Sequence, residues 1–371
     1  MKRFASIFLS MILAVGMLAG CGSSTTGSGS KGGTQVGIVL PTKDEPRWLQ
    51  DQKQFEKLLT EAGFTSEVLF SQGSSATEKT NVESLITSGV KVLVICAQDA
   101  SAAGAAVEAA KAAGVTVICY DRLITDTDAV DYYVTFDSVA VGEAQGQYLI
   151  DNKPEGTGIP LYLYAGAATD NNAFLFFEGA WKVLQPYIAD GTFVIANSSE
   201  AVALQDKAEL TYDEKSKILG QVTTDWDFNV AKSKAEAHLT ANDASMKGDV
   251  LILAPNDGTS RAIADAFTAD ADVSSYVITG QDAELASINY IQGGKQSMTV
   301  FKNTSTLAAD SVAMASAILK GEKASTDTTY NNGKIDVPAK QTPVTVVTAD
   351  NYKQVLVDSG YYTQEEIDSA K

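Results

Sequence analysis

The sequence predicts an α/β protein built from two doubly wound parallel-sheet lobes joined by a hinge. Short runs rich in β-branched residues alternate with helical segments whose apolar residues recur every three or four positions. This alternation starts near residue 35 and begins again near residue 159. The length from about residue 34 to residue 371 also exceeds what one hydrophobic core usually serves. These observations favour two successive sheets, each covered by helices on both faces.

Five apolar runs form the expected first sheet within residues 36–137. They are VGIVLP, SEVLFSQ, VKVLVICA, VTVICYD and YYVTFD. Helical segments such as residues 47–63 and 76–89 lie between them. Gly63, Gly89 and Gly114 stand where a left-handed C-cap would end a helix. Continuous apolar runs between helices are typical of buried parallel strands.

Five more runs form the expected second sheet, after a hinge near Asp137 to Gly142. They are IPLYLYAG, GTFVIANS, GDVLILAPND, SSYVITGQD and SMTVFKN. Helical segments, among them residues 171–188 and 258–270, again separate the runs. The polar segment Ser199–Ile218 fits neither pattern. We expect it to be a surface excursion, and its sequence indicates no function.

The first residues predict export. Lys2 and Arg3 precede an apolar run that ends at LAGC, the layout of a secretory signal. This run is shorter than the roughly 20 residues that a membrane span needs. We therefore expect a signal peptide over residues 1–20, a lipid-modified Cys21 and a flexible Gly/Ser-rich tether over residues 21–34. The mature protein would be anchored by lipid to the outer face of the cell membrane, or be periplasmic.

Composition excludes several classes of partner. The chain has 28 Lys and Arg against 46 Asp and Glu, a net charge of -18, which argues against nucleic acid. Cys96 and Cys119 are expected to be buried free thiols and not a disulfide. No metal or cofactor is expected, because no dinucleotide fingerprint follows a strand and Asp126 to Asp131 lacks the Gly and Glu of a calcium loop.

Polar side chains follow most of the expected strands. In open α/β sheets, ligands bind beyond the carboxyl ends of the strands. Any single Asp or Asn there could be a helix N-cap. The set as a whole instead offers carboxylates, amides, cations and aromatic rings, the groups that bind the hydroxyls and the apolar face of a sugar. It comprises Arg47, Trp48, Asp121, Arg122, Asp137, Asp170, Asn172, Trp226, Asn256, Asp282 and Lys302.

Eight blocks of sequence, in order, resemble the xylose-binding protein of bacterial sugar ABC importers and the related multiple-sugar-binding proteins. The blocks are PRWLQD, YDRLITD, DYYVTFDSVAVGEAQG, TDNNAFLF, APNDGTSRA, TGQDAEL, MTVFKN and TTYNNGKIDVPAKQTPVTV. The resemblance implies a type I periplasmic-binding-protein fold, and carries the family's sugar contacts onto the eleven residues above. It implies a first lobe of residues 35–137 and 303–327 and a second lobe of residues 138–302 and 328–371.

The function implied by this resemblance is capture of an aldose between closing lobes and its delivery to an ABC importer. Xylose is the first candidate, with glucose, galactose or arabinose as others. The protein would be a monomer whose partners are the permease subunits and, as a further option, a chemoreceptor or sensor kinase. A nucleoside or a signalling furanone stays open as an alternative ligand, because Trp48 and Trp226 could enclose a base.

An enzyme is not expected. Glycoside hydrolysis needs a carboxylic acid with a raised pKa, and Arg122 beside Asp121 would instead hold that carboxyl ionised. No nucleophile elbow appears, and the single His238 reads as a helix residue. A sugar-responsive repressor would need a basic N-terminal DNA-binding segment, where this chain has the expected signal and tether.

Overall fold

The computed structural model describes residues 34–370. The expected signal peptide, Cys21 and all but the last residue of the tether therefore lie outside the described residues. Within residues 34–370, no helix is both long enough and apolar enough to cross a membrane.

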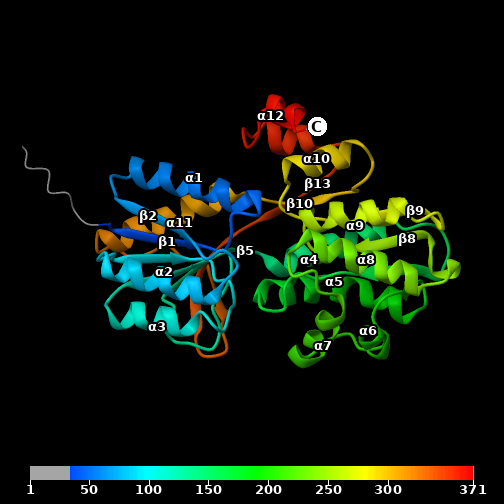
Figure 1. Ribbon diagram of the computed structural model, residues 1–371, viewed down its shortest axis with the longest axis horizontal. Helices are drawn as coiled ribbons and strands as arrows, with labels where there is room; N and C mark the ends of the chain where they lie inside the picture. The colour runs from blue at the N-terminus through cyan, green and yellow to red at the C-terminus, as the bar shows by residue number, and fades with distance from the viewer. Residues whose placement is uncertain (1–33, 371) are drawn as a thin grey trace, which may run out of the picture. The chain divides into compact units, whose positions relative to one another are not determined.

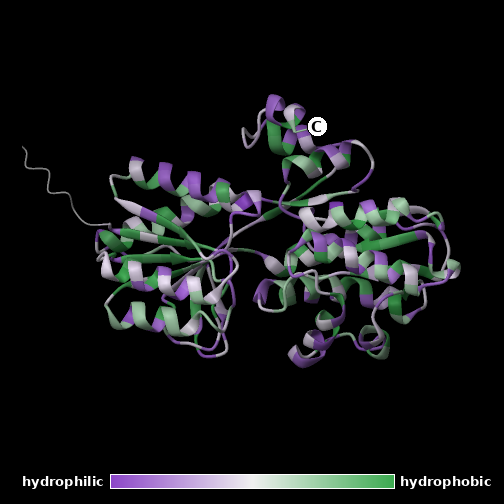
Figure 2. Cartoon of the chain, viewed as in Figure 1, coloured by the Kyte–Doolittle hydropathy of each residue, from purple (hydrophilic) through white to green (hydrophobic). Residues whose placement is uncertain are grey.

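The first sheet has seven strands in the order β11-β12-β5-β4-β3-β1-β2. Figure 1 shows this sheet with helices on both sides of it. All neighbours are parallel except β11 and β12, which form an antiparallel hairpin. The strands are β1 (Val36–Leu40), β2 (Ser66–Phe70), β3 (Val92–Ile95), β4 (Thr116–Tyr120), β5 (Tyr132–Phe136), β11 (Thr328–Asn331) and β12 (Asp336–Thr342). Figure 2 shows the central strands as largely hydrophobic, as expected for strands covered on both faces.

Helices cover both faces of the first sheet. On one face α1 (Pro46–Glu61) and α11 (Thr304–Leu319) pack against β1, β3 and β4 through apolar residues such as Phe55 and Leu307. On the other face lie α2 (Ser75–Thr87) and α3 (Gly104–Ala112). The residues after α1 and α2 confirm the expected C-caps, since Gly63 and Gly89 have φ of 82° and 85°.

The second sheet has four parallel strands in the order β7-β6-β8-β9. They are β6 (Ile159–Leu163), β7 (Phe193–Ile195), β8 (Gly248–Leu253) and β9 (Val273–Ile278). One face packs on α4 (Ser138–Asp151), α5 (Asn171–Ala189) and α7 (Tyr212–Val222), and the other on α8 (Phe228–Ala241) and α9 (Asp257–Ala269). The predicted class, two α/β lobes with parallel sheets, is therefore confirmed.

The remaining elements surround a small antiparallel pair. β10 (Thr299–Lys302) pairs with β13 (Val344–Val347), and a bridge between Gln281 and Val300 joins β10 to the end of β9. A separate apolar cluster holds α10 (Leu285–Gln292) against the C-terminal segment. That segment contains the π-helical turn Lys353–Val357 and α12 (Gln364–Ser369). Elsewhere, a 3-10 turn (Ala244–Met246) lies between α8 and β8.

The chain passes between the lobes three times. Asp137 lies between β5 and α4, Asn303 between β10 and α11, and Pro343 between β12 and β13. The expected third crossing near Asp327 is wrong, because residues 328–342 remain in the first lobe. There β12 pairs in parallel with β5, as in the register of Ala339 with Tyr133. A parallel edge strand has its partner far away in the sequence, so no local pattern reveals the pairing.

The segment Ser199–Ile218 is more regular than the sequence suggested. It holds α6 (Ser199–Ala203) and the first two turns of α7. Thr211 caps α7 together with Glu214, which closes a capping box. Cys96 and Cys119 are free and buried, as expected.

Candidate functional site

Ten of the eleven predicted residues line one pocket between the two lobes. They are Arg47, Trp48, Asp121, Arg122, Asp170, Asn172, Trp226, Asn256, Asp282 and Lys302. Most of them follow the carboxyl end of a strand, namely β4, β6, β8, β9 or β10. Parallel strands end at the same edge of a sheet, so residues from distant parts of the chain come together there.

Asp137 is the predicted residue that the structure does not bring into this pocket. Its side chain accepts a hydrogen bond from the Ala140 backbone N–H at 3.0 Å and caps α4. This is the N-cap role that competes with ligand binding for any Asp at a strand-to-helix junction.

Three lining residues were missed in the sequence: Glu45, Phe176 and Gln281. Phe176 lies four residues after Asn172 in α5, so both side chains project from the same face of the helix. Gln281 directly precedes Asp282 at the end of the strand. Helical spacing from Asn172 could have identified Phe176. Nothing in the sequence marked Glu45 as a site residue except that it lies two positions before Arg47.

Three site residues have backbone angles that L-amino acids rarely adopt. The φ angles are 62° at Asp121, 60° at Trp226 and 100° at Asp282. Such conformations cost about 1–3 kcal/mol each and gather at functional sites. At these positions the strained backbone turns the chain sharply after a strand or loop, and each of the three side chains lines the pocket.

In the first lobe, Arg47 is the partner of Asp121. Its Nη2 lies 2.6 Å from Asp121 Oδ2, and its guanidinium stacks 4.4 Å from the centre of the Trp48 ring. Burial alone would raise the pKa of Asp121, but Arg47, Lys302 and Arg122 outweigh it and hold the pKa below its usual value. This direction agrees with the expectation that Asp121 stays ionised, but the residue that binds its carboxylate is Arg47 and not Arg122.

Behind Arg47 lies the fully buried Asp51. Its Oδ2 is 3.7 Å from Arg47 Nε. Burial raises the pKa of Asp51 to about 7, although Arg47 partly opposes the shift. Asp51 does not line the pocket and supports Arg47 from the side of α1.

Two ion pairs cross directly between the lobes. Arg122 Nε of the first lobe lies 2.9 Å from Asp170 Oδ2 of the second. Arg47 Nη1 lies 3.7 Å from Asp282 Oδ1, which also pairs with Lys302 at 2.9 Å. Burial raises the pKa of Asp170, and the attraction of Arg122 offsets this only in part.

Amide and indole groups complete the site. Asn172 Nδ2 of the second lobe donates to the Asp121 backbone oxygen of the first at 2.9 Å. Trp226 Nε1 is buried and has no hydrogen-bond partner among the described residues. An indole N–H that has lost its water without gaining an acceptor is a group on which a ligand oxygen would be favourable.

These side chains lie close to one another, and the cavity between them holds only about 20 Å³. That is room for a single water molecule. A ligand the size of a sugar can therefore enter only when the lobes separate and the side chains withdraw. The ligand would then form hydrogen bonds with the charged groups that pair with each other across the lobes here.

The described residues offer no arrangement typical of metal chemistry or of a histidine base. No group of three or more His, Cys, Asp or Glu among residues 34–370 could hold a metal ion. Burial lowers the pKa of His238 to about 4, so this residue is neutral at pH 7. His238 lies in α8 and contacts Asn197 and Tyr164, away from the pocket.

Comparison with known proteins agrees with this geometry. A sequence profile described as "Periplasmic binding protein domain" matches residues 36–323. The multiple sugar-binding periplasmic protein SbpA of Azospirillum brasilense is 36% identical over 363 residues, which cover 95% of this chain and 96% of that protein. The D-xylose-binding periplasmic protein of Escherichia coli (strain K12) is 32% identical and covers 90% of this chain and 92% of its own length.

A solved structure is more similar still. The carbohydrate transporter solute binding protein from Chloroflexus aurantiacus, in complex with D-glucose, has 66% sequence identity and a TM-score of 0.88. It covers 90% of this chain and 98% of its own. The chain therefore belongs to the periplasmic binding protein family, whose members bind solutes for transport and are not enzymes.

Proposed function

We propose that this protein captures a monosaccharide between its two lobes and delivers it to an ABC importer. The observation that carries the proposal is the convergence of ten polar and aromatic side chains from both lobes on one pocket. Carboxylates and amides accept from sugar hydroxyls, and Arg47, Arg122 and Lys302 donate to sugar oxygens. The indoles of Trp48 and Trp226 suit the apolar face of the ring.

D-Glucose is the best-supported ligand. The structurally similar protein from Chloroflexus aurantiacus contains D-glucose, and another from Clostridium phytofermentans, 34% identical with a TM-score of 0.79, contains β-D-glucose. The sequence alone favoured D-xylose, which has support from the relative in Escherichia coli. A protein that takes both aldoses would be consistent with the multiple-sugar names of other relatives.

The mechanism follows from the ion pairs between the lobes. A sugar that contacts both lobes binds the closed form better than the open form, so it shifts the population toward closure. Arg122 and Asp170 pair with each other here. In the closed form with a sugar bound, Arg122 would donate hydrogen bonds to the sugar and Asp170 would accept hydrogen bonds from it. The proposed carrier is monomeric and tethered through a lipid on Cys21. A chemoreceptor or sensor kinase is a further proposed partner that would bind the closed form.

Calorimetric titration tests the ligand. The panel is D-glucose, D-xylose, D-galactose and L-arabinose, with adenosine as the nucleoside arm. We expect one site per chain with an affinity in the micromolar range or better for at least one aldose. Binding of adenosine in preference to every sugar would contradict the proposal. Mass spectrometry of the protein extracted from membranes, with Cys21→Ser as the control, tests the lipid anchor.

A further inference from the structure

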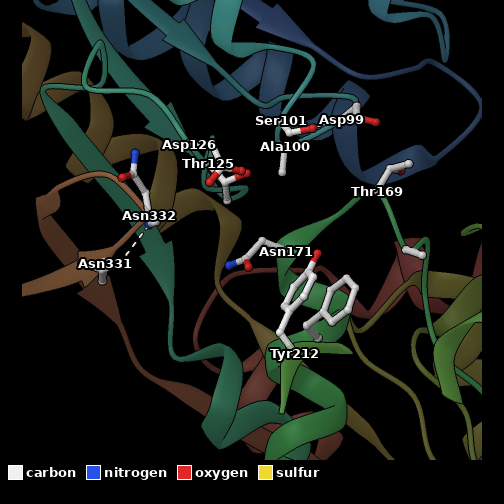
Figure 3. A pocket seen from close by; sticks show the side chains of 13 residues that line it. Asp99, Ala100, Ser101, Thr125, Asp126, Thr169, Asn171, Tyr212, Asn331 and Asn332 are labelled. Carbon is white, nitrogen blue, oxygen red and sulfur yellow. Dashed lines mark hydrogen bonds between the residues drawn. The ribbon is translucent and has the colours of Figure 1, made fainter. Parts of the chain in front are cut away.

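A second and larger cavity lies between the lobes, outside the sugar pocket. It has a volume of about 450 Å³, within the range of small-molecule sites. It shares no lining residue with the sugar pocket. The Ala100 backbone N–H donates to the Thr169 backbone oxygen at 2.9 Å, which joins the two lobes at its edge. We call this cavity the outer cleft; its lining includes Asp99, Ser101, Asp126, Asn171, Phe174 and Tyr212 (Figure 3).

An aromatic platform forms part of the outer cleft. The ring of Tyr212 stacks on Phe174 with 4.5 Å between centroids and 16° between planes. Phe174 is buried, whereas Tyr212 is 59% exposed. Core packing explains Phe174 but not an exposed tyrosine held flat against it. A flat aromatic ring with an accessible surface is the group on which the apolar face of a sugar stacks.

The segment Ser199–Ile218, to which the sequence assigned no role, holds Tyr212 in place. Tyr212 is the first residue of α7, directly after the capping-box residue Thr211. Lys207 pairs with Glu214 of this box at 2.6 Å, and Trp181 Nε1 donates to the Lys207 backbone oxygen at 2.9 Å. These contacts fix the start of α7, and the stack on Phe174 orients the ring, so a ligand has less ordering to supply.

Hydrogen-bonding groups face the platform from both lobes. Asn171 and Asp126 both line the cleft, and the hydrogen bond that Asp126 makes to the described residues comes from its backbone N–H, which donates to the Asn332 backbone oxygen at 2.8 Å. Figure 3 shows the Asn171 amide projecting into the space between Asp126 and Tyr212. Asp99 uses Oδ1 to accept from the backbone N–H groups of Ser101 and Ala102, while Oδ2 accepts no hydrogen bond from residues 34–370.

The charge of the lining selects the class of ligand. The described residues that line the outer cleft include no Lys or Arg, which disfavours phosphates and carboxylates. Carboxylate and amide groups around an aromatic ring match the hydroxyls and C–H face of a neutral saccharide. We propose that the outer cleft is a second carbohydrate site, separate from the sugar pocket and formed in full only when the lobes are closed.

Closure couples the two sites. Asp99 and Asp126 belong to the first lobe, whereas Asn171 and Tyr212 belong to the second. A saccharide that bridges them favours the closed form, which is also the form that a sugar in the inner pocket favours. Each ligand must then increase the affinity of the other by the same factor. The outer site goes beyond the capture function and does not depend on which aldose fills the inner pocket.

Saturation-transfer NMR tests the outer site on the full chain. The probes are maltose and cellobiose, each added to wild type with and without saturating D-glucose. Tyr212→Ala removes the platform. Tyr187→Ala is the matched control, because Tyr187 also stacks on a phenylalanine, Phe193 at 5.4 Å, outside the cleft. Thermal unfolding of each variant verifies the fold.

We expect a disaccharide signal that persists under saturating D-glucose in wild type and Tyr187→Ala. In Tyr212→Ala the disaccharide should bind about fivefold more weakly or not at all. Complete displacement by D-glucose, or equal binding to Tyr212→Ala, would overturn the proposal. Choline is the probe for a cation site, and a Tyr212-dependent signal from choline alone would also overturn it. The proposed function of the inner sugar pocket is tested separately, because its failure would appear as absence of D-glucose binding in calorimetry.

Discussion

Arg122 and Asp170 form an ion pair between the two lobes, with Nε 2.9 Å from Oδ2 and both side chains almost fully buried. Arg122 follows β4 in the first sheet, and Asp170 caps α5 in the second lobe. The closed arrangement thus has a charged contact of its own at the place proposed for the sugar. A ligand must replace this contact with bonds of at least equal strength, which favours a ligand rich in donors and acceptors.

The first prediction concerns this pair. Arg122→Ala leaves Asp170 buried without its cation, and breaking a buried pair in this way costs about 3–5 kcal/mol. We therefore expect a lower free energy of unfolding in urea and loss of measurable sugar binding in calorimetry. Lys182→Ala is the control, because the Lys182–Glu143 pair is exposed and such pairs contribute about 1 kcal/mol or less. Unchanged sugar affinity in Arg122→Ala would contradict the role proposed for this arginine.

The second prediction concerns the pH dependence of stability. Burial raises the pKa of Asp51 to about 7, whereas in the unfolded chain this carboxyl has its ordinary value near 3.8. Between these values the folded protein binds one more proton than the unfolded chain, so stability falls as pH rises. The contribution of Asp51 should decline by about 2–4 kcal/mol between pH 4 and pH 7. In Asp51→Asn this decline should be absent.

The measurement is the difference in unfolding free energy between wild type and Asp51→Asn at several pH values. It must decrease from pH 4 to pH 7 if Asp51 takes up a proton as proposed. A difference that stays flat or increases over this range would show that Asp51 is ionised throughout. Asp121 should behave in the opposite way, because its lowered pKa means that its contribution is present near neutral pH and is lost only in acid.

The third prediction concerns the close packing of α4 on α5. A Cβ on Gly142 would lie 1.8 Å from the Phe176 backbone oxygen, and one on Gly179 would lie 2.0 Å from the Val139 backbone oxygen. Backbone atoms cannot move aside locally, so Gly142→Ala must separate the helices and cost about 1–3 kcal/mol or more. Gly220→Ala is the control, because this glycine of α7 has open space around it. That variant should be more stable by about 0.4–1 kcal/mol, and thermal unfolding of the three proteins distinguishes these outcomes.

Most of the site could be predicted from the sequence because parallel strands end at a common edge. This rule, with the resemblance to sugar-binding proteins, identified Asp121, Asn256, Asp282 and Lys302 although they are spread over 182 positions. The pairing of charges could not be predicted. Arg122 is adjacent to Asp121, yet Asp121 binds Arg47 from α1 while Arg122 reaches across to Asp170. Sequence neighbours at a sharp turn point in different directions, so adjacency says little about contact.

The edge strands of the first sheet could not be assigned from the sequence either. The resemblance assigned residues 328–342 to the second lobe, whereas they form β11 and β12 of the first sheet. The pattern of apolar residues does not say which sheet a segment joins. The parallel partner of β12 is β5, which lies about 200 residues earlier in the chain. The stacked position of Tyr212 had no sequence signal either, because it depends on how α7 packs against α5.

The last prediction concerns how Trp226 is held in the sugar pocket. A Cβ on Gly166 would lie 2.0 Å from a carbon of the Trp226 ring, so the indole packs directly against the glycine backbone. Gly166→Ala must therefore displace the ring and its unpaired Nε1 from the pocket. We expect sugar affinity to fall by about 1–3 kcal/mol, which is about five- to 150-fold, in calorimetry. Trp226→Phe keeps a ring but lacks the N–H group, so it separates stacking from hydrogen bonding. If Trp226→Phe binds sugar as tightly as wild type while Gly166→Ala does not, the ring stacks on the sugar and Nε1 contributes nothing. If both variants retain full affinity, Trp226 is not part of the binding site.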